Sequence, residues 1–501
     1  MREQLTKLVR HTAVYGVGRM ASKVISFLLI PFYTHYFATT EYGVMEILNL
    51  AAMIAGIALA PGLSNAAMRF YYETEDEGER NSTISTALIF SLVVGAAAAF
   101  LMTVYSAPIA SILLGKSQYA ILVSLVALGF FFSLFSDICL VYLRSKQKSG
   151  LYVLLTQGFL TLCIALNIYF VAARKLGVKG VFLSNAIAGA IFGGTLLWLT
   201  TRHVGLHFSV KKLAAMLRFG APLILTWLAA FVLNFSDRFF LQRYSDLSHV
   251  GVYSVAYKFG YIVSLAVVQP FNLGWEPQAY EIAKQENGQA MFARIFSLYS
   301  ALLVTTAFMM SLFIQEVFSV MVDAKFFLAY ALVPLIAFAY VCQGIQGFVE
   351  AGLLITKKTR LIGLIGLWCT VLCLLLNLVF IHLWTMWGAC IATFMSMLAM
   401  AAVTYWYSER AYPTGCNLWP LVKTTALAGV LLLCTLLIPI DAAVTRVIIK
   451  IAFVAIYVSG MLKFGLIPRQ DVTEMRAVVA EWAHNRLAVA QGWLNTLYRS
   501  E

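Results

Sequence analysis

Long apolar runs recur along the whole chain. A membrane-spanning helix needs roughly 20 predominantly apolar residues, and the 501 residues are 61% hydrophobic and only 12% charged. This composition leaves little room for water-soluble domains, which average about 25% charged residues. The sequence therefore predicts an all-α polytopic membrane protein with about fourteen transmembrane helices. The apolar runs lie near 12–36, 44–67, 84–106, 119–143, 151–172, 180–200, 219–242, 250–272, 295–315, 327–354, 361–383, 388–407, 421–440 and 445–467.

Basic residues are concentrated in alternate connections between these runs. The chain has 36 Lys and Arg against 23 Asp and Glu, and a net charge of +13 could by itself indicate nucleic-acid binding. Their clusters at 144–148, 202–218 and 357–360 instead follow the rule that cytosolic loops carry an excess of Lys and Arg. We therefore expect cytosolic N- and C-termini and no nucleic-acid partner, although the basic connection at 174–179 lies on the opposite side.

The sequence lacks the motifs of common enzymes and metal sites. The eight cysteines include no CxxC pair, and no HExxH, P-loop or GxSxG motif occurs. The connections between the apolar runs are also too short for a glycosyltransferase domain. We therefore expect no metal site, no disulfide and no enzymatic activity.

The two halves of the chain are similar in sequence. "LVRHTAVYGV" from Leu8 matches "MLRFGAPLIL" from Met216, and "HYFATTEYGV" matches "RYSDLSHVGV". These matches pair Gly43 with Gly251 at a constant offset of 208 positions, and "LCIALN" later matches "LCLLLN". Parallel repeats related by an axis along the membrane normal are found in transporters, with the substrate site between the repeats.

The duplication predicts how the chain is divided. Residues 1–208 would form an N-lobe of six helices and residues 209–415 a C-lobe of six helices with the same orientation. Residues 416–468 would add two helices outside the duplication. The segment 469–501 carries an apolar stripe and is predicted to be an amphipathic cytosolic tail on the inner leaflet.

Five motifs stand out in the two repeats. They are G-x-x-x-S-K-x-x-S-F-L-L-I-P-F-Y at 18–33, EYGV at 41–44, RFYYE at 69–73, SDRFFL at 236–241 and VGVYSVAYKF at 250–259. Through these motifs the chain resembles the polysaccharide-transporter branch of the multidrug/oligosaccharidyl-lipid/polysaccharide (MOP) flippase superfamily, the Wzx-type flippases of lipid-linked sugars. The similarity covers roughly residues 8–410.

This resemblance implies a fold, a substrate and an energy source. Two six-helix lobes would form a V around a central cavity in the bacterial cytoplasmic (inner) membrane. Alternating access would carry an undecaprenyl-pyrophosphate-linked oligosaccharide, such as an O-antigen precursor, to the outer leaflet. A proton or sodium gradient would drive the movement without a bound cofactor. We expect a monomer that works beside a polysaccharide polymerase and a chain-length regulator.

Two cations lie within the first apolar run. Arg19 and Lys23 are one turn apart on a polar stripe, and a cation at the centre of a span costs roughly 2.5–3.5 kcal/mol unless it faces a cavity or a partner. We predict that both bind the pyrophosphate, because an arginine fork and a lysine point charge suit phosphate oxygens. Alternatively, Arg19 reaches the inner membrane surface and Lys23 packs between helices.

Three charged residues lie near the outer ends of 219–242 and 250–272. Asp237 precedes the connection at Leu247 by ten residues and Lys258 follows it by eleven, so antiparallel neighbours would bring both to a similar depth. The spacing predicts an ion pair between them, and opening of that pair on protonation would make Asp237 a coupling residue. Arg238 and Lys258 are also candidate ligands of the pyrophosphate, with Arg238 pointing either into the cavity or up to the headgroups.

Other polar residues within the runs are candidates for the cavity. Asp137 lies at a depth similar to that of Arg19, so the two would pair, and Asp137 is a second coupling candidate. Gln343, Gln346 and Glu350 share one face of their run and suit sugar hydroxyls. They equally suit hydrogen bonds between helices, which are common in membranes.

Two further charges lie near the ends of runs. The segment 69–81 is predicted to be a solvated inner loop, whose first residue, Arg69, would gate the inner mouth. Glu46 begins the second run near the outer surface, where a hydrated interfacial position explains it at least as well as a site does.

Three functions compete at this stage. The first is a flippase for a lipid-linked oligosaccharide. The second is a drug or cation antiporter of the same superfamily, which would need acidic residues to dominate its cavity; the basic first run favours an anionic substrate instead. The third is a non-transporting membrane scaffold that recruits polysaccharide-assembly enzymes through its tail.

Overall fold

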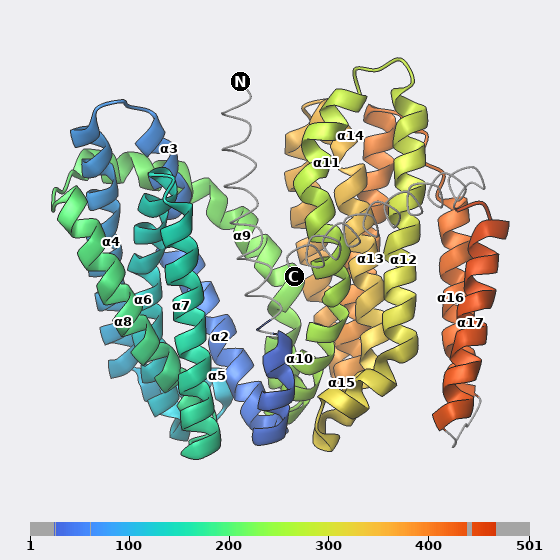
Figure 1. Ribbon diagram of the computed structural model, residues 1–501, viewed down its shortest axis with the longest axis horizontal. Coiled ribbons are helices and arrows are strands. Elements are labelled where there is room, and N and C mark those ends of the chain that lie inside the picture. The colour runs from blue at the N-terminus through green and yellow to red at the C-terminus, as the bar shows by residue number, and fades with distance from the viewer. Residues whose placement is uncertain (1–24, 26, 61, 438–442, 467–501) are drawn as a thin grey trace, which may run out of the picture. The chain divides into compact units, whose positions relative to one another are not determined.

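The computed structural model describes residues 25, 27–60, 62–437 and 443–466, and within these ranges the chain is almost entirely helical (Figure 1). Among the described residues, 10 helices are long and apolar enough to span a membrane. The expected all-α, multi-pass architecture is therefore confirmed. The number of about fourteen spans stays a prediction, and the expected tail at 469–501 lies outside the described residues.

The described chain forms two compact units. The first combines the described residues up to Phe259 with Glu316–Ile336 and Gly363–Ser396, and the second combines Gly260–Gln315, Ala337–Ile362 and the described residues from Met397 onward. Several helices contribute residues to both units, so these bounds do not test the predicted lobe boundary between residues 208 and 209.

Most helices of the first unit come from the first half of the chain. They are α2 (Thr39–Leu59), α3 (Leu63–Tyr72), α4 (Glu77–Val104), α5 (Ser106–Leu114), η1 (Ser117–Tyr119), α6 (Ala120–Ser145), α7 (Ser149–Asn167), η2 (Ile168–Ala173), α8 (Val178–Val204), α9 (Val210–Tyr244) and α10 (Leu247–Gly260). The remaining elements are η3 (Ser264–Val268), α11 (Gln269–Ile282), α12 (Gly288–Met321), η4 (Ala324–Leu332), α13 (Val333–Val349), α14 (Ala351–Ile355), α15 (Thr359–Ala411), α16 (Trp419–Leu437) and α17 (Ala443–Lys463).

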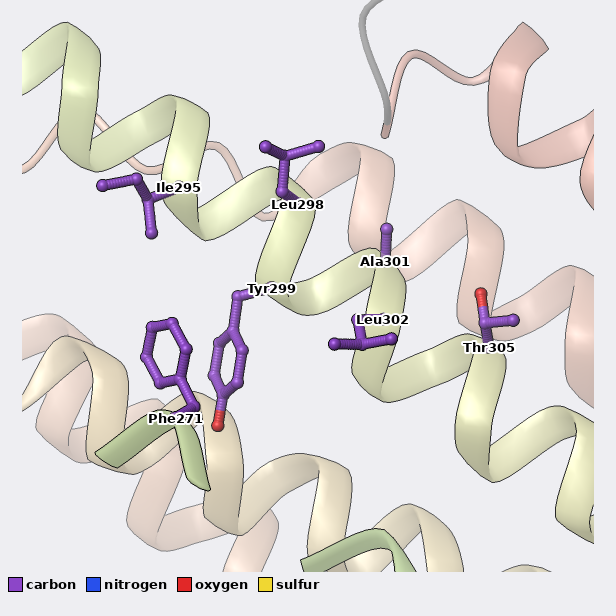
Figure 2. A pocket seen from close by; sticks show the side chains of 7 residues that line it. All are labelled: Phe271, Ile295, Leu298, Tyr299, Ala301, Leu302 and Thr305. Atoms are coloured by element: carbon purple, nitrogen blue, oxygen red, sulfur yellow. The ribbon is translucent and has the colours of Figure 1, made fainter. Parts of the chain in front are cut away.

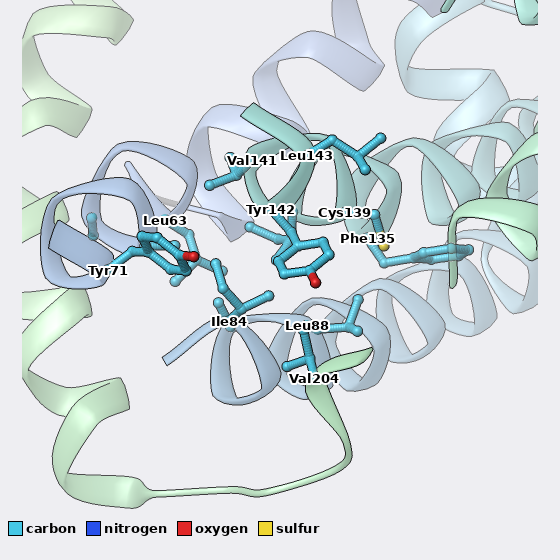
Figure 3. Close-up of a cluster of buried hydrophobic side chains, with 14 of the residues drawn as sticks. Leu63, Tyr71, Ile84, Leu88, Phe135, Cys139, Val141, Tyr142, Leu143 and Val204 are labelled. Carbon is cyan, nitrogen blue, oxygen red and sulfur yellow. The ribbon is translucent and has the colours of Figure 1, made fainter. Parts of the chain in front are cut away.

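A buried apolar cluster joins α3, α4, α6 and α8 in the first unit (Figure 3). Tyr71, Leu88 and Phe135 are each at most 2% exposed, and Ala67 and Ala87 between them are fully buried. Lipid tails are as apolar as these side chains, so close packing rather than exclusion of water holds such helices together. The small alanines let neighbouring backbones approach, and this cluster fixes the positions of the first unit's helices.

The connection between α3 and α4 is shorter than expected. The prediction of a solvated loop over 69–81 is wrong for most of that segment, because the two helices leave only four residues between them. Asp76 caps α4, where its carboxylate accepts a hydrogen bond from the backbone N–H of Glu79 at 2.7 Å. Glu77 in the first turn also suits the helix dipole and pairs with Lys146 at 2.7 Å.

Helix α15 contains two of the expected spans. The runs predicted at 361–383 and 388–407 lie on either side of Thr385, where the backbone leaves helical geometry at φ 48° and ψ −120°. The chain turns tightly there, since a Cβ added to Gly388 would lie 1.9 Å from the carbonyl oxygen of Phe380. Only glycine fits such a contact.

The duplicated asparagines play similar parts in the structure. Asn167 and Asn377 end the matching "LCIALN" and "LCLLLN" segments and are 3% and 0% exposed. The Nδ2 atom of Asn167 donates to the hydroxyl of Tyr33, and that of Asn377 donates to Ser236, each at 3.1 Å. Each repeat therefore uses this buried amide to join two of its own segments.

Candidate functional site

Helices α2 and α10 of the first unit meet at two glycines. A Cβ on Gly43 would lie 1.9 Å from the carbonyl oxygen of Leu247, and a Cβ on Gly251 would lie 2.0 Å from that of Thr39. The contact is reciprocal, because Thr39 and Leu247 are related by the same offset of 208 positions as the glycines. Equivalent positions of the two repeats therefore touch around a local two-fold axis, at a distance that side chains would prevent.

An ion pair joins the same two helices next to this contact. The Nζ atom of Lys258 on α10 forms a short hydrogen-bonded ion pair with Oε1 of Glu46 on α2, and it also donates to the hydroxyl of Tyr42 at 2.9 Å. Tyr42 is fully buried and the Glu46 side chain is 13% exposed, whereas the Lys258 side chain is 38% exposed. A charge that is partly removed from water needs such partners.

The expected ion pair between Asp237 and Lys258 is therefore wrong. Lys258 faces α2, while Asp237 accepts a hydrogen bond from Tyr253 on α10. Lys258 follows Tyr253 by five positions, which places the two side chains about 140° apart around a helix with 3.6 residues per turn. The two charges therefore lie against different faces of α10.

Asp237 instead pairs with its neighbour Arg238. The Nη1 atom of Arg238 donates to Oδ1 of Asp237 at 2.7 Å and to the carbonyl oxygen of Asn234 at 2.7 Å. The guanidinium carbon lies 3.7 Å from the centre of the Tyr257 ring, a close cation–π contact. Both charged residues are 3% exposed. The expectation that Arg238 faces the cavity or the headgroups is thus wrong for this structure, because the neighbouring carboxylate and ring enclose its charge.

An apolar pocket of about 450 Å³ lies along α12 in the second unit (Figure 2). The rings of Phe271 and Tyr299 stack against each other at its edge, with centroids 3.8 Å apart. The hydroxyl groups of Thr305 and Tyr457 are 3.2 Å apart, so the pocket lies next to α17. Its lining suits a hydrocarbon chain better than a sugar. It consists of Phe271, Ile295, Leu298, Tyr299, Ala301, Leu302 and Thr305.

Comparison with known proteins identifies the family. A family model described as polysaccharide biosynthesis protein matches residues 8–277, which is more than half of the chain. The chain belongs to this family. Over 312 residues it is 23% identical to a protein of the Lsg locus of Haemophilus influenzae, covering 60% of this chain and 72% of that relative.

This polysaccharide biosynthesis protein has the fold of MOP-superfamily transporters. It is similar to the lipid II flippase MurJ in an inward closed conformation, with a TM-score of 0.70, 12% identity and coverage of 89% of this chain and 98% of MurJ. It is also similar to an inward-facing multidrug resistance MATE family transporter, with a TM-score of 0.64, 15% identity and coverage of 78% and 95%. The family match agrees with the polysaccharide branch inferred from the sequence motifs, and the two solved structures show the fold.

Some of the predicted site residues of this polysaccharide biosynthesis protein cannot be compared with the structure. Arg19 and Lys23 lie outside the described residues, so their binding of a pyrophosphate stays a prediction. Asp137 is exposed on α6, and its expected pairing with Arg19 stays a prediction for the same reason.

The polar face expected near residue 350 is present. Gln343, Gln346 and Glu350 are all half-buried, while Phe348 and Val349 beside them are buried. Gln346 donates a short hydrogen bond to Glu350, and Gln343 accepts one from Ser264 at 3.5 Å. These contacts fit the alternative that the polar side chains form hydrogen bonds within the protein. Their contact with a sugar stays a prediction.

Arg69 lies on α3 rather than in a loop. Its Nε atom donates to Glu73 at 3.1 Å, and its guanidinium carbon lies 4.6 Å from the centre of the Phe219 ring on α9. The side chain is 56% exposed. Arg69 therefore bridges the surfaces of two helices, and a gating role for it stays a prediction.

Sequence analysis did not identify Glu46 and Tyr42 as partners of Lys258. Two signals for them were present in the sequence. A carboxylate within an apolar run predicts a cationic partner, and Glu46 lies one turn after Gly43. The match between Gly43 and Gly251 was the second signal. If the two repeats meet at these equivalent glycines, the residues that follow each glycine on the two helices also lie close together.

Proposed function

We propose that this polysaccharide biosynthesis protein flips undecaprenyl-pyrophosphate-linked oligosaccharides from the cytosolic to the outer leaflet of a bacterial inner membrane. Its family and fold support a transporter of a lipid-linked precursor. The ion pair between Lys258 and Glu46 is the structural observation that carries the proposal, because it joins the two repeats through a cation that remains partly exposed. A pyrophosphate needs such a cation as a ligand.

The apolar pocket suits the other end of this substrate. A polyprenyl chain is hydrocarbon along its whole length, and the pocket along α12 is lined almost entirely by apolar side chains. The pocket would hold part of that chain beside α17. A cationic drug would gain nothing from a lysine in its site, which disfavours the antiporter.

The energy source and partners are also part of the proposal. A proton or sodium gradient would act through buried or cavity-facing carboxylates, of which Asp237 and Asp137 are the candidates. Both termini would be cytosolic, and the protein would act as a monomer that delivers its substrate to a polysaccharide polymerase and a chain-length regulator.

A deletion strain tests the proposed function. We expect loss of surface polysaccharide and accumulation of lipid-linked repeat units in the cytosolic leaflet, both reversed when the chain is expressed again. Normal surface polysaccharide without accumulation of the precursor would reject the flippase. Loss of polysaccharide without any lipid-linked precursor would favour the scaffold, because the assembly enzymes would then have failed.

Replacing the two cations of the first run tests where the headgroup binds. Hydrogen bonds to charged groups contribute about 1.5–3 kcal/mol each, so Arg19→Ala/Lys23→Ala is expected to lower surface polysaccharide by about tenfold or more. Arg174→Ala/Lys175→Ala also removes two positive charges, but from exposed positions, and should have no effect. Full complementation by the first variant, at equal abundance in the membrane, would show that neither cation binds the substrate.

A further inference from the structure

We infer that the Lys258–Glu46 pair is a latch that an anionic headgroup opens by replacing Glu46 on Lys258. The inference rests on the proposed function, since it requires a substrate with a phosphate or pyrophosphate group. It assigns Glu46 and Tyr42 a part in transport: they hold the two repeats together in the absence of substrate.

The contacts between α2 and α10 form a continuous seam. Thr39 and Ser248 lie at one end, with their hydroxyl oxygens 2.7 Å apart, and the two glycines follow. The ion pair lies one turn farther along α2 and about two turns farther along α10. Because the glycine contact depends on shape alone, the ion pair is the part of this seam that a charged ligand can weaken.

Lys258 can bind a competing anionic ligand because its side chain is more exposed than that of Glu46. An ammonium group has three N–H donors, and the described residues engage two of them through Tyr42 and Glu46. The lysine side chain is 38% exposed against 13% for Glu46. A ligand oxygen can therefore first bind the third donor and then displace the carboxylate.

When the ligand replaces Glu46, the ammonium group of Lys258 keeps an anionic partner. A phosphate oxygen replaces a carboxylate oxygen, and both form charge-assisted hydrogen bonds with an ammonium. Glu46 is left with a negative charge close to that of the ligand, and this repulsion drives α2 away from α10. An uncharged lipid alcohol has no such effect, so the latch distinguishes the activated lipid from the free alcohol.

Thermodynamic linkage adds a second expectation. If the ligand weakens the latch, the latch must weaken ligand binding by the same factor, and such couplings are typically 5–150-fold. Glu46→Gln keeps the size of the side chain but removes its charge. The variant should therefore open the seam without ligand and bind the pyrophosphate at least about fivefold more tightly.

Disulfide trapping measures the closed seam directly. The hydroxyl contact allows Thr39→Cys/Ser248→Cys to form a disulfide on oxidation of native membranes, with the two single-substitution variants, which keep the native cysteines, as blanks. Farnesyl pyrophosphate serves as the probe and farnesol as its uncharged control. We expect farnesyl pyrophosphate to lower the yield at least about fivefold and farnesol to leave it unchanged. Lys258→Gln in the same background should abolish the response.

A matched ion pair controls for general effects of lost charge. Glu46→Gln should lower the disulfide yield without ligand, whereas Glu77→Gln, which breaks the pair with Lys146, should not. If the double-cysteine variant is poorly made, labelling of Ser248→Cys by a maleimide reports opening of the same seam.

Two results would overturn the latch. One is a disulfide yield that Glu46→Gln leaves unchanged, and the other is an equal response to farnesyl pyrophosphate and farnesol. Failure of the proposed function has a different signature: the seam still responds to pyrophosphate, but the deletion strain keeps its surface polysaccharide.

Discussion

Gly43→Leu is expected to abolish surface polysaccharide. Even a Cβ at this position would lie 1.9 Å from the carbonyl oxygen of Leu247, so α2 and α10 would have to separate. Ordinary overpacking costs about 1–3 kcal/mol, and contact with backbone rather than with a flexible side chain cannot be relieved by a new rotamer. We expect the activity to fall by about a hundredfold or more, measured as surface polysaccharide per molecule of protein in the membrane.

The two-fold contact makes this prediction unusually specific. Gly251→Leu should match Gly43→Leu, because its Cβ would lie 2.0 Å from the carbonyl oxygen of Thr39. Gly129→Leu on α6 is the control, since a Cβ there meets nothing within 4 Å. Wild-type polysaccharide with either seam variant would show that transport does not need the glycine contact.

The sequence was most informative where one residue pattern repeats. Apolar runs predicted a multi-pass helical protein, and the duplicated "EYGV" and "HVGV" segments contain the glycines that touch in the structure. Such features follow from local composition or from symmetry. The break of α15 at Thr385 falls between the two runs predicted at 361–383 and 388–407.

Side-chain partners were predictable only in part. Counting residues along the chain predicted only a depth for Lys258, whereas its partner depended on which face of α10 meets α2, and counting does not determine rotation about a helix axis. Asp237 was assigned the wrong partner for the same reason. For Arg238, the carboxylate of the preceding residue and the ring of Tyr257 on α10 enclose the charge, and only the tertiary packing brings that ring near.

The burial of Arg238 leads to a second large effect. Removing one partner of a buried ion pair leaves the other charge uncompensated and costs about 3–5 kcal/mol. Arg238→Ala should therefore lower the melting temperature in detergent sharply and remove most of the folded protein from the membrane. Arg69→Ala is the matched control: its side chain is 56% exposed, and exposed pairs contribute about 0–1 kcal/mol.

The same variant separates a structural role for Arg238 from a role in binding substrate. A structural role predicts that Asp237→Asn/Arg238→Met, which removes both charges and keeps similar volumes, regains much of the lost stability, because no buried charge is then left unpaired. A substrate ligand predicts the reverse, with Arg238→Ala as stable and abundant as the wild type but inactive. Because Asp237, Tyr253 and Tyr257 already surround the guanidinium, we expect the first result. It would leave Lys258 as the second repeat's cation for the headgroup.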